Sequence, residues 1–357
     1  MWSKISSCTG CGIKLQSESP NSPGFIPSQT EGKSLCKRCY RLTHYGELAP
    51  TPLSQEVELK LAKNAISHSQ LVLMLIDPID FAGTLSPELI RLAQGKLAVV
   101  LTKMDLLPPI AKTQEVVAWC REELSRRGAR AQAIFPISSK NGMGISRLSS
   151  FLRKRAPSRT AIVGVTNVGK SALLERLLPQ AAPKPTISTL AGTTLDLNSR
   201  PYHGGQILDT PGLTPEGRMD AHLCPSCQTK LIPSSPISSM LYELDGGEAL
   251  LFGSLGCLIN HNQTVLQVYV PGSIKLHRTN AEKAPALLAE APRWLGGSCA
   301  KCPPKKWEEQ EFTLEPLEDL AIAGLGWVSV RRMPTTVQAI LPQGIRTQVR
   351  SAMLQKR

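Results

Sequence analysis

The sequence predicts an α/β fold in which a parallel β-sheet carries helices on both faces, with a small cysteine module before it and an α+β domain after it. Between residues 70 and 222, apolar segments of strand length alternate with segments of helical length. This alternation is typical of a parallel sheet with crossover helices. Two Cys-x-x-Cys pairs precede the region, and beyond residue 223 the alternation loosens. We therefore predict three domains, at residues 1–47, 48–222 and 223–357.

The predicted strands and helices of the central region follow one another in order along the chain. Residues 70–77 form an apolar strand, 87–94 a short helix and 96–102 a buried strand. Residues 113–127 repeat apolar residues at helical spacing (Val116, Val117, Cys120, Leu124). Strands at 131–137, 161–165 and 206–208 and helices at 145–155 and 171–178 complete this region. Chemically active motifs should lie at the carboxyl ends of the strands, where such sheets bind ligands.

The last domain is predicted to mix strands and one helix. Strands are expected at residues 250–258, 264–270, 328–330 and 336–341, and a helix at 283–290. The final stretch, 320–357, contains no Asp or Glu. It carries six basic residues: Arg331, Arg332, Arg346, Arg350, Lys356 and Arg357. We interpret it as a basic tail suited to RNA phosphates; the alternative is a merely solvated surface.

Charge and hydropathy bound the possible partners. The chain has 41 Lys and Arg against 28 Asp and Glu, a net charge of +13 that favours a polyanionic partner over an acidic protein. Only 4% of residues are aromatic, so no base-stacking platform is evident. No apolar run approaches the ~18 residues of a membrane span, and no signal peptide is evident at the N-terminus. We expect no membrane partner and a reducing, cytoplasmic compartment, where Cys-x-x-Cys pairs indicate metal or redox chemistry.

The N-terminal module contains two of the four Cys-x-x-Cys pairs: Cys8/Cys11 and Cys36/Cys39. The 24 residues between the pairs are a plausible length for a zinc-finger loop. Residues 16–29 are rich in Ser, Pro and Gln and are too polar to pack without a metal. We predict that these four cysteines bind Zn²⁺; the alternative is free surface thiols.

The last domain contains the other two pairs: Cys224/Cys227 and Cys299/Cys302. A separation of 71 residues is long, but cysteines distant in sequence can still meet. A second zinc site is one interpretation; independent thiols or a redox pair are the alternatives. Two lone cysteines, Cys120 and Cys257, are expected to be small buried hydrophobic residues.

A phosphate loop follows the predicted strand 161–165 and precedes a helix. Its sequence is Gly164-Val165-Thr166-Asn167-Val168-Gly169-Lys170-Ser171. Backbone N–H groups of this loop, those of Gly164, Asn167, Val168 and Gly169 among them, can approach phosphates, and the helix N-terminus adds its positive end. Lys170 should reach the β- and γ-phosphates and the Ser171 hydroxyl should bind Mg²⁺. A strand before the loop and a helix after it are the structural context that a phosphate loop requires.

Two later motifs complete the predicted phosphate end of the site. In Asp209-Thr210-Pro211-Gly212, Asp209 ends a strand and suits a second Mg²⁺ contact, and the Gly212 N–H suits the γ-phosphate. Either Thr193 or Thr194 should complete the coordination of Mg²⁺. The alternative is that these two threonines only begin the next strand.

Two earlier motifs favour guanine over adenine. The carboxylate of Asp105, in Thr102-Lys103-Met104-Asp105, can accept hydrogen bonds from guanine N1 and N2, which adenine does not offer. The Lys103 stem can lie along the base, and Thr102 stands where Asn is more usual. Ser138-Ser139-Lys140 is a conservative form of Ser-Ala-Lys. Each motif alone is weak, but four at strand ends predict a GTP site together.

The residues around the γ-phosphate predict a slow enzyme. Leu213 follows the Asp209 motif, so the glutamine that orients water in many GTPases is absent. Asn167 occupies the loop position at which an asparagine binds K⁺ in potassium-activated GTPases. We expect slow hydrolysis that K⁺ or a partner accelerates; the alternative is that Asn167 only shapes the loop.

The order of the motifs is unusual, because the guanine motifs precede the phosphate loop. In this order the chain resembles the circularly permuted GTPases, and specifically the YqeH-type ribosome-assembly GTPases with an N-terminal four-cysteine zinc finger. Three other stretches resemble that family: Asp77-Pro-Ile-Asp80-Phe81, Met219-Asp-Ala-His222 and His277-Arg278-Thr279-Asn280-Ala-Glu-Lys283. The cysteines at 224, 227, 299 and 302 are outside the family pattern.

The resemblance implies GTP hydrolysis during assembly of the small (30S) ribosomal subunit, with rRNA and ribosomal protein as partners. It favours the bacterial cytoplasm, with an organelle as the alternative. Two other functions remain open: a GTPase that serves RNA modification, and a zinc-dependent RNA-binding protein with a non-catalytic nucleotide switch. Because the permuted chain runs from Gly212 directly into the basic C-terminal domain, we expect GTP binding to reorient that domain.

Overall fold

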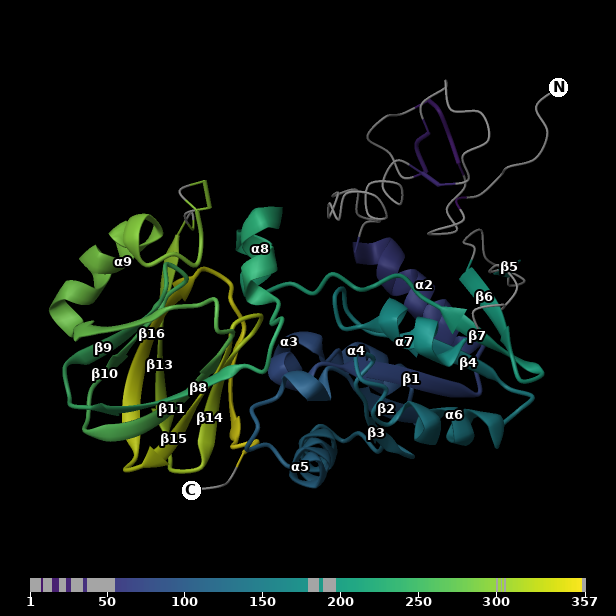
Figure 1. The fold of residues 1–357 in the computed structure, drawn as a ribbon, viewed down its shortest axis with the longest axis horizontal. Coiled ribbons are helices and arrows are strands. Elements are labelled where there is room, and N and C mark those ends of the chain that lie inside the picture. Colours follow the sequence, from purple (N-terminus) through teal and green to yellow (C-terminus); the bar gives the residue numbers. More distant parts are fainter. Residues whose placement is uncertain are drawn as a thin grey trace. The chain divides into compact units, whose positions relative to one another are not determined.

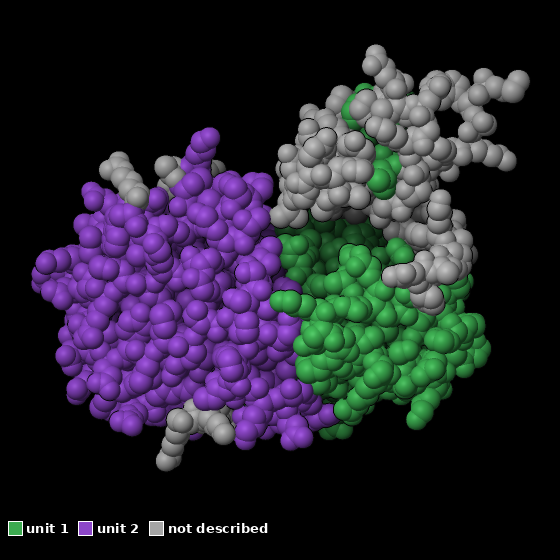
Figure 2. Space-filling model, viewed as in Figure 1, with its two compact units in different colours: residues 1–75, 86–102, 124–214 green, residues 76–85, 103–123, 215–357 purple. Residues whose placement is uncertain are grey.

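The computed structural model describes residues 8, 15–18, 24–26, 35–36, 55–178, 186–188, 197–299, 301–302, 304 and 306–354 (Figure 1). The chain divides into two compact units (Figure 2). Unit 1 comprises residues 1–75, 86–102 and 124–214. Unit 2 comprises residues 76–85, 103–123 and 215–357. Unit 2 therefore takes two segments from the region between the predicted zinc module and the phosphate loop, together with the C-terminal part of the chain.

A seven-stranded sheet in the order β3-β2-β1-β4-β7-β6-β5 is the centre of the predicted α/β region. Its strands are β1 (Leu71–Ile76), β2 (Leu97–Leu101), β3 (Ile134–Pro136), β4 (Arg159–Val163), β5 (Thr186–Ser188), β6 (Leu197–Tyr202) and β7 (Gly205–Asp209). The pairs β2/β3, β1/β4 and β4/β7 are parallel. Every residue of β1 and β2 is buried, which explains their continuous apolar sequences. The edge differs from the expected parallel sheet, because β5, β6 and β7 pair antiparallel.

Helices flank this sheet in two pairs, which confirms the predicted α/β class. They are α2 (Gln55–Ser67), α4 (Pro87–Leu92), α6 (Ile145–Arg153) and α7 (Lys170–Leu177). Helix α2 packs on α4, and α6 packs on α7. Ser86 begins α4 because its hydroxyl accepts the N–H of Leu89 at 3.4 Å, with Pro87 in the first turn. Helix α2 was not predicted; it buries Leu61, Ala62, Ala65 and Ile66.

The strand order confirms the circular permutation. The phosphate loop follows β4, whose neighbours in the sheet are β1 and β7. Strand β7 comes later in the chain, but β1 comes before the loop. In an unpermuted chain, the strand that follows Gly212 would lie beside β4. Here β1, which precedes the phosphate loop, occupies that place, and the chain after Gly212 leaves the sheet.

Unit 2 contains two antiparallel five-stranded sheets, in the orders β12-β9-β10-β16-β13 and β17-β14-β15-β11-β8 (Figure 1). Their strands are β8 (Ser238–Leu244), β9 (Glu248–Phe252), β10 (Cys257–Asn260), β11 (Thr264–Val270), β12 (Leu276–Asn280), β13 (Trp307–Leu314), β14 (Glu318–Ile322), β15 (Gly326–Arg332), β16 (Thr335–Pro342) and β17 (Thr347–Ser351). The remaining elements are η1 (Pro78–Asp80), α3 (Phe81–Thr84), η2 (Met104–Leu106), α5 (Thr113–Arg126), η3 (Met219–His222), α8 (Pro225–Leu231), η4 (Ala281–Lys283) and α9 (Ala284–Trp294). Strands thus dominate the predicted α+β domain.

Side chains alternate between two cores across the first of these sheets. Leu250 and Phe252 of β9 belong to the core shared by both sheets, and Ala249 and Leu251 pack with α9. This period of two is the geometry of a strand covered on both faces. The expected single strand at 250–258 is wrong, because a turn between β9 and β10 contains Gly253 at φ 55°. A Cβ there would lie 2.8 Å from the carbonyl oxygen of Gly296.

The expected basic tail is instead a set of paired strands, β15 to β17. Arg350 is 4% exposed and forms an ion pair with Asp319, with Arg350 Nε 3.6 Å from Asp319 Oδ2. Arg331 donates to the Leu354 carbonyl at 2.8 Å and to the Tyr269 hydroxyl at 2.6 Å. The expectation that Arg350 contacts RNA phosphates is therefore wrong, because its charge is used inside the fold.

Other basic residues of that stretch remain available to solvent. Arg332 and Arg346 are exposed, and Lys356 and Arg357 lie outside the described residues. Among the described helices, none is both long and apolar enough to span a bilayer.

Candidate nucleotide site

The phosphate loop connects β4 to α7 and uses left-handed backbone at two positions. Asn167 has φ 62° and Gly169 has φ 104°. Glycine adopts such angles without a steric cost, and Asn tolerates the region near 60° better than most residues. The loop therefore begins α7 with its backbone turned in the way the Gly-x4-Gly-Lys-Ser spacing predicts.

Two glycines allow close backbone approaches within unit 1. A Cβ on Gly164 would lie 3.2 Å from the Cβ of Leu75. A Cβ on Gly212 would lie 3.0 Å from Lys170 Nζ and 3.0 Å from Thr166 Cα. A side chain at either position would require its neighbours to shift. The predicted γ-phosphate sensor Gly212 thus lies directly against the phosphate loop.

Lys170 and Asp209 bring opposite charges to this end of the sheet. Lys170 Nζ donates to the carbonyl oxygens of Gly164 at 2.9 Å and Val165 at 3.1 Å. Burial lowers the pKa of Lys170 to about 8, although the carboxylates of Asp209 and Glu58 oppose this shift. Burial also raises the pKa of Asp209, and the charge of Lys170 opposes that change. A cation and a carboxylate beside the loop suit phosphates and Mg²⁺ respectively.

Residues after Gly212 are bonded to the loop and to a residue that the sequence analysis missed. The Thr166 N–H donates to the Leu213 carbonyl at 2.7 Å, and the Leu213 N–H donates to the Gly164 carbonyl at 3.1 Å. Glu58 of α2, 5% exposed, accepts the Thr214 N–H at 2.8 Å and its hydroxyl at 3.3 Å. The available signal was a carboxylate on the apolar stripe of an amphipathic helix. Glu58 is thus a buried anchor for the segment that follows Gly212.

The predicted guanine loop at residues 138–140 is held by the phosphate-loop helix. Ser138 is fully buried, and its hydroxyl oxygen accepts the Asn141 N–H at 3.3 Å. Arg176 of α7 donates to the Ser139 carbonyl at 2.7 Å and to the Lys140 carbonyl at 2.8 Å. Sequence reasoning missed Arg176, because a surface arginine on a helix shows no sign of its partner. The two predicted motifs are thus physically joined.

The other guanine motif begins in unit 1 and continues in unit 2. Thr102 is 2% exposed, and a Cβ on Gly169 would lie 3.8 Å from the Thr102 Cβ. Lys103 has φ 53°, and its ammonium lies 2.7 Å from Asp77 Oδ2. The Asp77 carboxylate also accepts the Ile79 N–H at 3.0 Å. Asp77 is therefore the partner that fixes Lys103, and its Asp-Pro-Ile-Asp context was the available signal.

Unit 2 holds the segment downstream of Gly212 through a partly buried ion cluster. Arg218 lies 3.3 Å from Asp80 and 3.2 Å from Asp220. Asp80 Oδ1 also accepts the Gly324 N–H at 2.9 Å. Burial raises the pKa of Asp80, and the charge of Arg218 opposes this shift. A largely buried carboxylate is stabilised by a cationic partner, so Asp80 fixes the position of Arg218.

Backbone hydrogen bonds join the same segment to two turns of the C-terminal sheets. The Arg346 N–H donates to the Gly217 carbonyl at 2.8 Å, and the Met219 N–H donates to the Ala323 carbonyl at 2.9 Å. Met219 is fully buried in the core between the two sheets. Residues 217–219 are therefore a structural part of unit 2.

The predicted N-terminal zinc ligands are described in part. Cys8 and Cys36 are buried and pack with Leu15 and Leu35. The Cys8 sulfur accepts the Cys36 N–H at 3.1 Å. Cys11 and Cys39 lie outside the described residues, as do the predicted Mg²⁺ ligands Thr193 and Thr194.

The predicted second group of cysteines does come together. The Sγ atoms of Cys224, Cys227, Cys299 and Cys302 all lie within 4.8 Å of one another. Their arrangement is compatible with zinc. The two lone cysteines are buried as expected, with Cys120 and Cys257 both fully inaccessible.

Comparison with known families matches two separate parts of the chain. The family described as "50S ribosome-binding GTPase" matches residues 159–232, and the family described as "YqeH-like, C-terminal" matches residues 263–353. The protein YqeH of Bacillus subtilis is 29% identical, and the alignment covers 97% of this chain and 99% of that protein. NO-associated protein 1, chloroplastic/mitochondrial, of Arabidopsis thaliana is 27% identical over 93% of this chain and 71% of its own length.

A third relative carries a ribosomal description. The small ribosomal subunit biogenesis GTPase RsgA of onion yellows phytoplasma is 34% identical over 49% of this chain and 57% of its own length. The GTPase match includes the phosphate loop, the Asp209 motif and the segment held by Asp80. Together with the permuted strand order, these findings show a circularly permuted GTPase fold. The chain is similar to YqeH over nearly its whole length, and its C-terminal part matches the YqeH-like family.

Proposed function

We propose that this protein binds and hydrolyses GTP while it assists assembly of the small ribosomal subunit, and that its nucleotide state sets its affinity for the precursor particle. The observation that carries the proposal is the segment from Gly212 to Met219. Residues 213 and 214 are bonded to the phosphate loop and to Glu58, and residues 217–219 are bonded to the C-terminal sheets. Only Pro215 and Glu216 separate these two sets of hydrogen bonds. A conformational change at the γ-phosphate can therefore be transmitted to the C-terminal domain through a short segment of the chain.

The residues beside the loop fit the nucleotide and its ion. Lys170 and the loop N–H groups would hold the β- and γ-phosphates, and Ser171 and Asp209 would hold Mg²⁺, which neutralises phosphate charge when bound. Thr102, Lys103 and Asp105 would hold the guanine with residues 138–140. The close approach of Gly212 to Lys170 suits a backbone N–H that senses the γ-phosphate.

The partner follows from charge and from the relatives. The net charge of +13 and the exposed Arg332 and Arg346 suit rRNA phosphates, and a ribosomal protein is a further partner. The RsgA relative is named for the small subunit. We place the protein in the bacterial cytoplasm; relatives named for chloroplasts and mitochondria make an organelle the alternative.

Sedimentation with purified ribosomal subunits tests this function. We expect the full chain to pellet with small subunits in a GTP analogue and to be released in GDP, by a factor of about ten, which corresponds to about 1.4 kcal/mol of coupling. Arg218→Met should reduce this nucleotide dependence, because it leaves Asp80 without its cation. Lys154→Met, at an exposed position of unit 1, is the matched control. Equal pelleting in all nucleotide states contradicts the switch, and pelleting only with large subunits contradicts the assigned partner.

Cation dependence tests the role of Asn167. We expect K⁺ to raise kcat about tenfold over Na⁺, a barrier difference of about 1.4 kcal/mol. Asn167→Gly should abolish the difference, because glycine accepts φ 62° but offers no side-chain oxygen. Asn167→Asp retains an oxygen and should keep part of the effect. Equal turnover of the wild-type protein in K⁺ and Na⁺ would refute a cation site.

A further inference from the structure

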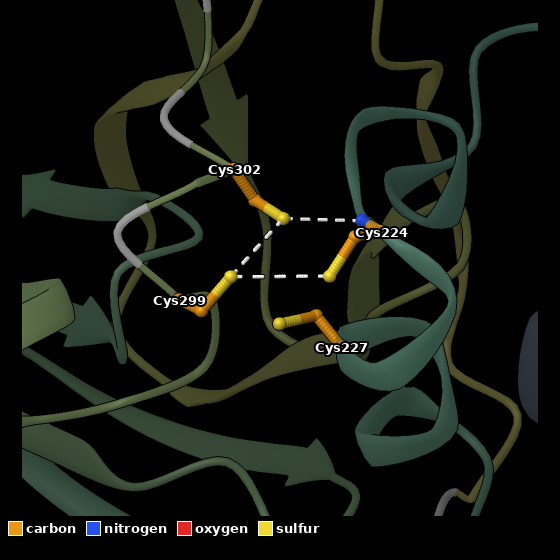
Figure 3. A group of neighbouring side chains, drawn as sticks. All are labelled: Cys224, Cys227, Cys299 and Cys302. Carbon is orange, nitrogen blue, oxygen red and sulfur yellow. Dashed lines mark hydrogen bonds between the residues drawn. The ribbon is translucent and has the colours of Figure 1, made fainter.

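Four thiols from two distant parts of unit 2 converge on one point (Figure 3). Cys224 directly precedes α8 and Cys227 lies in its first turn. Cys299 and Cys302 lie between α9 and β13. Figure 3 shows the sulfur atoms of both pairs pointing toward a common centre. The fold thus brings together side chains that are 75 residues apart in the chain, as Cys224 and Cys299 are.

The sulfur separations match a shared metal and not a disulfide. The Cys224 and Cys299 sulfurs are 3.8 Å apart, and those of Cys299 and Cys302 are 3.6 Å apart. A disulfide requires about 2.05 Å, and all four cysteines are free. Four thiolates at about 2.3 Å from a tetrahedral Zn²⁺ lie roughly 3.8 Å from one another. The site thus has the dimensions of a tetrathiolate zinc centre.

The backbone around the sulfurs forms two matching turns. The Cys227 N–H donates to the Cys224 carbonyl at 2.9 Å, and the Cys302 N–H donates to the Cys299 carbonyl at 2.9 Å. The Cys224 N–H also points at the Cys302 sulfur, 3.1 Å away. Each Cys-x-x-Cys pair therefore presents two sulfurs on one side of a tight turn, and a backbone N–H of one pair donates to a sulfur of the other.

The surroundings explain why a cation would be retained. Cys227 is 1% exposed and Cys302 is 6% exposed, and both belong to the core between the two sheets. Met219 and Leu223 belong to the same core. Thiolates in an apolar environment are costly unless a soft cation neutralises them. Four protein ligands leave no position for water or substrate, so such a centre is structural and not catalytic.

We propose that Cys224, Cys227, Cys299 and Cys302 bind one Zn²⁺ in a closed structural site that fastens α8 to the loop after α9. Helix α8 follows the segment that contains Arg218 and Met219, and α9 packs on strands β9, β10 and β16 of the five-stranded sheet. Zinc at this point cross-links the beginning of the C-terminal domain to its middle. Because the site lies outside the nucleotide motifs, the proposal of a zinc site does not depend on the proposed ribosomal function.

Metal content of the full-length protein tests the proposal. We expect Cys224→Ser/Cys299→Ser to contain one zinc ion fewer per chain than the wild-type protein, measured by mass spectrometry of the elements. The control Cys120→Ala/Cys257→Ala changes two buried cysteines outside the cluster and should leave the zinc content unchanged. Unchanged zinc in Cys224→Ser/Cys299→Ser, iron in place of zinc, or a disulfide among these four cysteines in the purified protein would overturn the proposal.

A second measurement covers the case in which that variant does not fold. Cys8→Ser/Cys36→Ser removes two of the predicted N-terminal ligands and keeps the C-terminal cluster intact. After exchange of zinc for Co²⁺, it should still show the thiolate-to-cobalt charge-transfer band and the visible bands of a tetrahedral four-sulfur site. Zinc removal should also lower the midpoint temperature of thermal unfolding of this variant. The absence of the cobalt bands in this variant would overturn the proposal whatever the fate of the other.

Discussion

Replacing Lys170 by Met should lower kcat for GTP hydrolysis at least a thousandfold, about 4 kcal/mol in barrier height. The ammonium is a partly buried cation beside the phosphate loop, and burial already lowers its pKa to about 8. A positive charge held in a desolvated place stabilises developing negative charge more than one in water does. Met keeps the stem and removes the charge. Single-turnover hydrolysis with saturating GTP measures the effect.

Stability separates this catalytic effect from misfolding. Lys170 donates to the Gly164 and Val165 carbonyls. Losing these two bonds costs about 1–3 kcal/mol, partly offset because a buried charge is also removed. Lys170→Met should therefore unfold at a denaturant concentration close to that of wild type. The control Lys154→Met should keep both stability and turnover. A Lys170→Met enzyme that retains a tenth of wild-type turnover would contradict the assigned role.

The backbone of the phosphate loop was predictable from sequence because its determinants are local. A Gly-x4-Gly-Lys-Ser spacing between an apolar strand and a helix specifies its own backbone. The buried strands β1 and β2 were recognisable in the sequence because each is a continuous run of apolar residues. By contrast, Glu58 and Arg176 act through partners 156 and 37 residues away, and no local pattern identifies such a partner. The parts of the site that depend on long-range packing required the structure.

The C-terminal sheets were predicted less well because their edges are polar. Strands β8 and β13 end their sheets and alternate exposed with partly exposed residues. Strand β13, with Glu308, Glu309 and Glu311, resembles a solvated loop in sequence. The basic stretch forms strands of these sheets, and the alternation of side chains along β17 points Arg350 inward. A charge pattern alone does not distinguish an RNA-binding surface from a buried ion pair.

Replacing Arg350 by Met should destabilise unit 2 by about 3–5 kcal/mol. Asp319 is fully buried, and Arg350 Nε lies 3.6 Å from it. The Arg350 guanidinium also lies 4.7 Å from the ring of Trp119. Removing the arginine leaves the Asp319 carboxylate in an apolar environment with hydrogen bonds from Ser329 and the Met353 N–H but without its cation. Denaturant titration of the full chain measures the loss, and Arg332→Met, at an exposed position of β15, is the control expected to change stability by less than about 0.5 kcal/mol.

The pH dependence of that variant identifies the cause. Burial raises the pKa of Asp319, and the charge of Arg350 opposes this shift. Without Arg350 the folded-state pKa should rise further above the unfolded value, so the folded state binds the proton more tightly. The stability of Arg350→Met should then increase as the pH falls through the folded pKa toward the unfolded pKa. The difference in free energy of unfolding between this variant and the wild type should therefore become smaller. A difference in free energy of unfolding that stays constant across this pH range would indicate lost packing against Trp119 instead.

A double-mutant cycle with Asp319→Asn measures the coupling between the two side chains. The amide that this substitution introduces is neutral, so Asp319→Asn/Arg350→Met buries neither charge. The double variant should be more stable than the sum of the two single losses predicts, by about 1–3 kcal/mol. Additive losses would mean that the two side chains contribute independently. A strong coupling would establish that Arg350, in the last basic stretch of this chain, stabilises the fold of the C-terminal domain through Asp319.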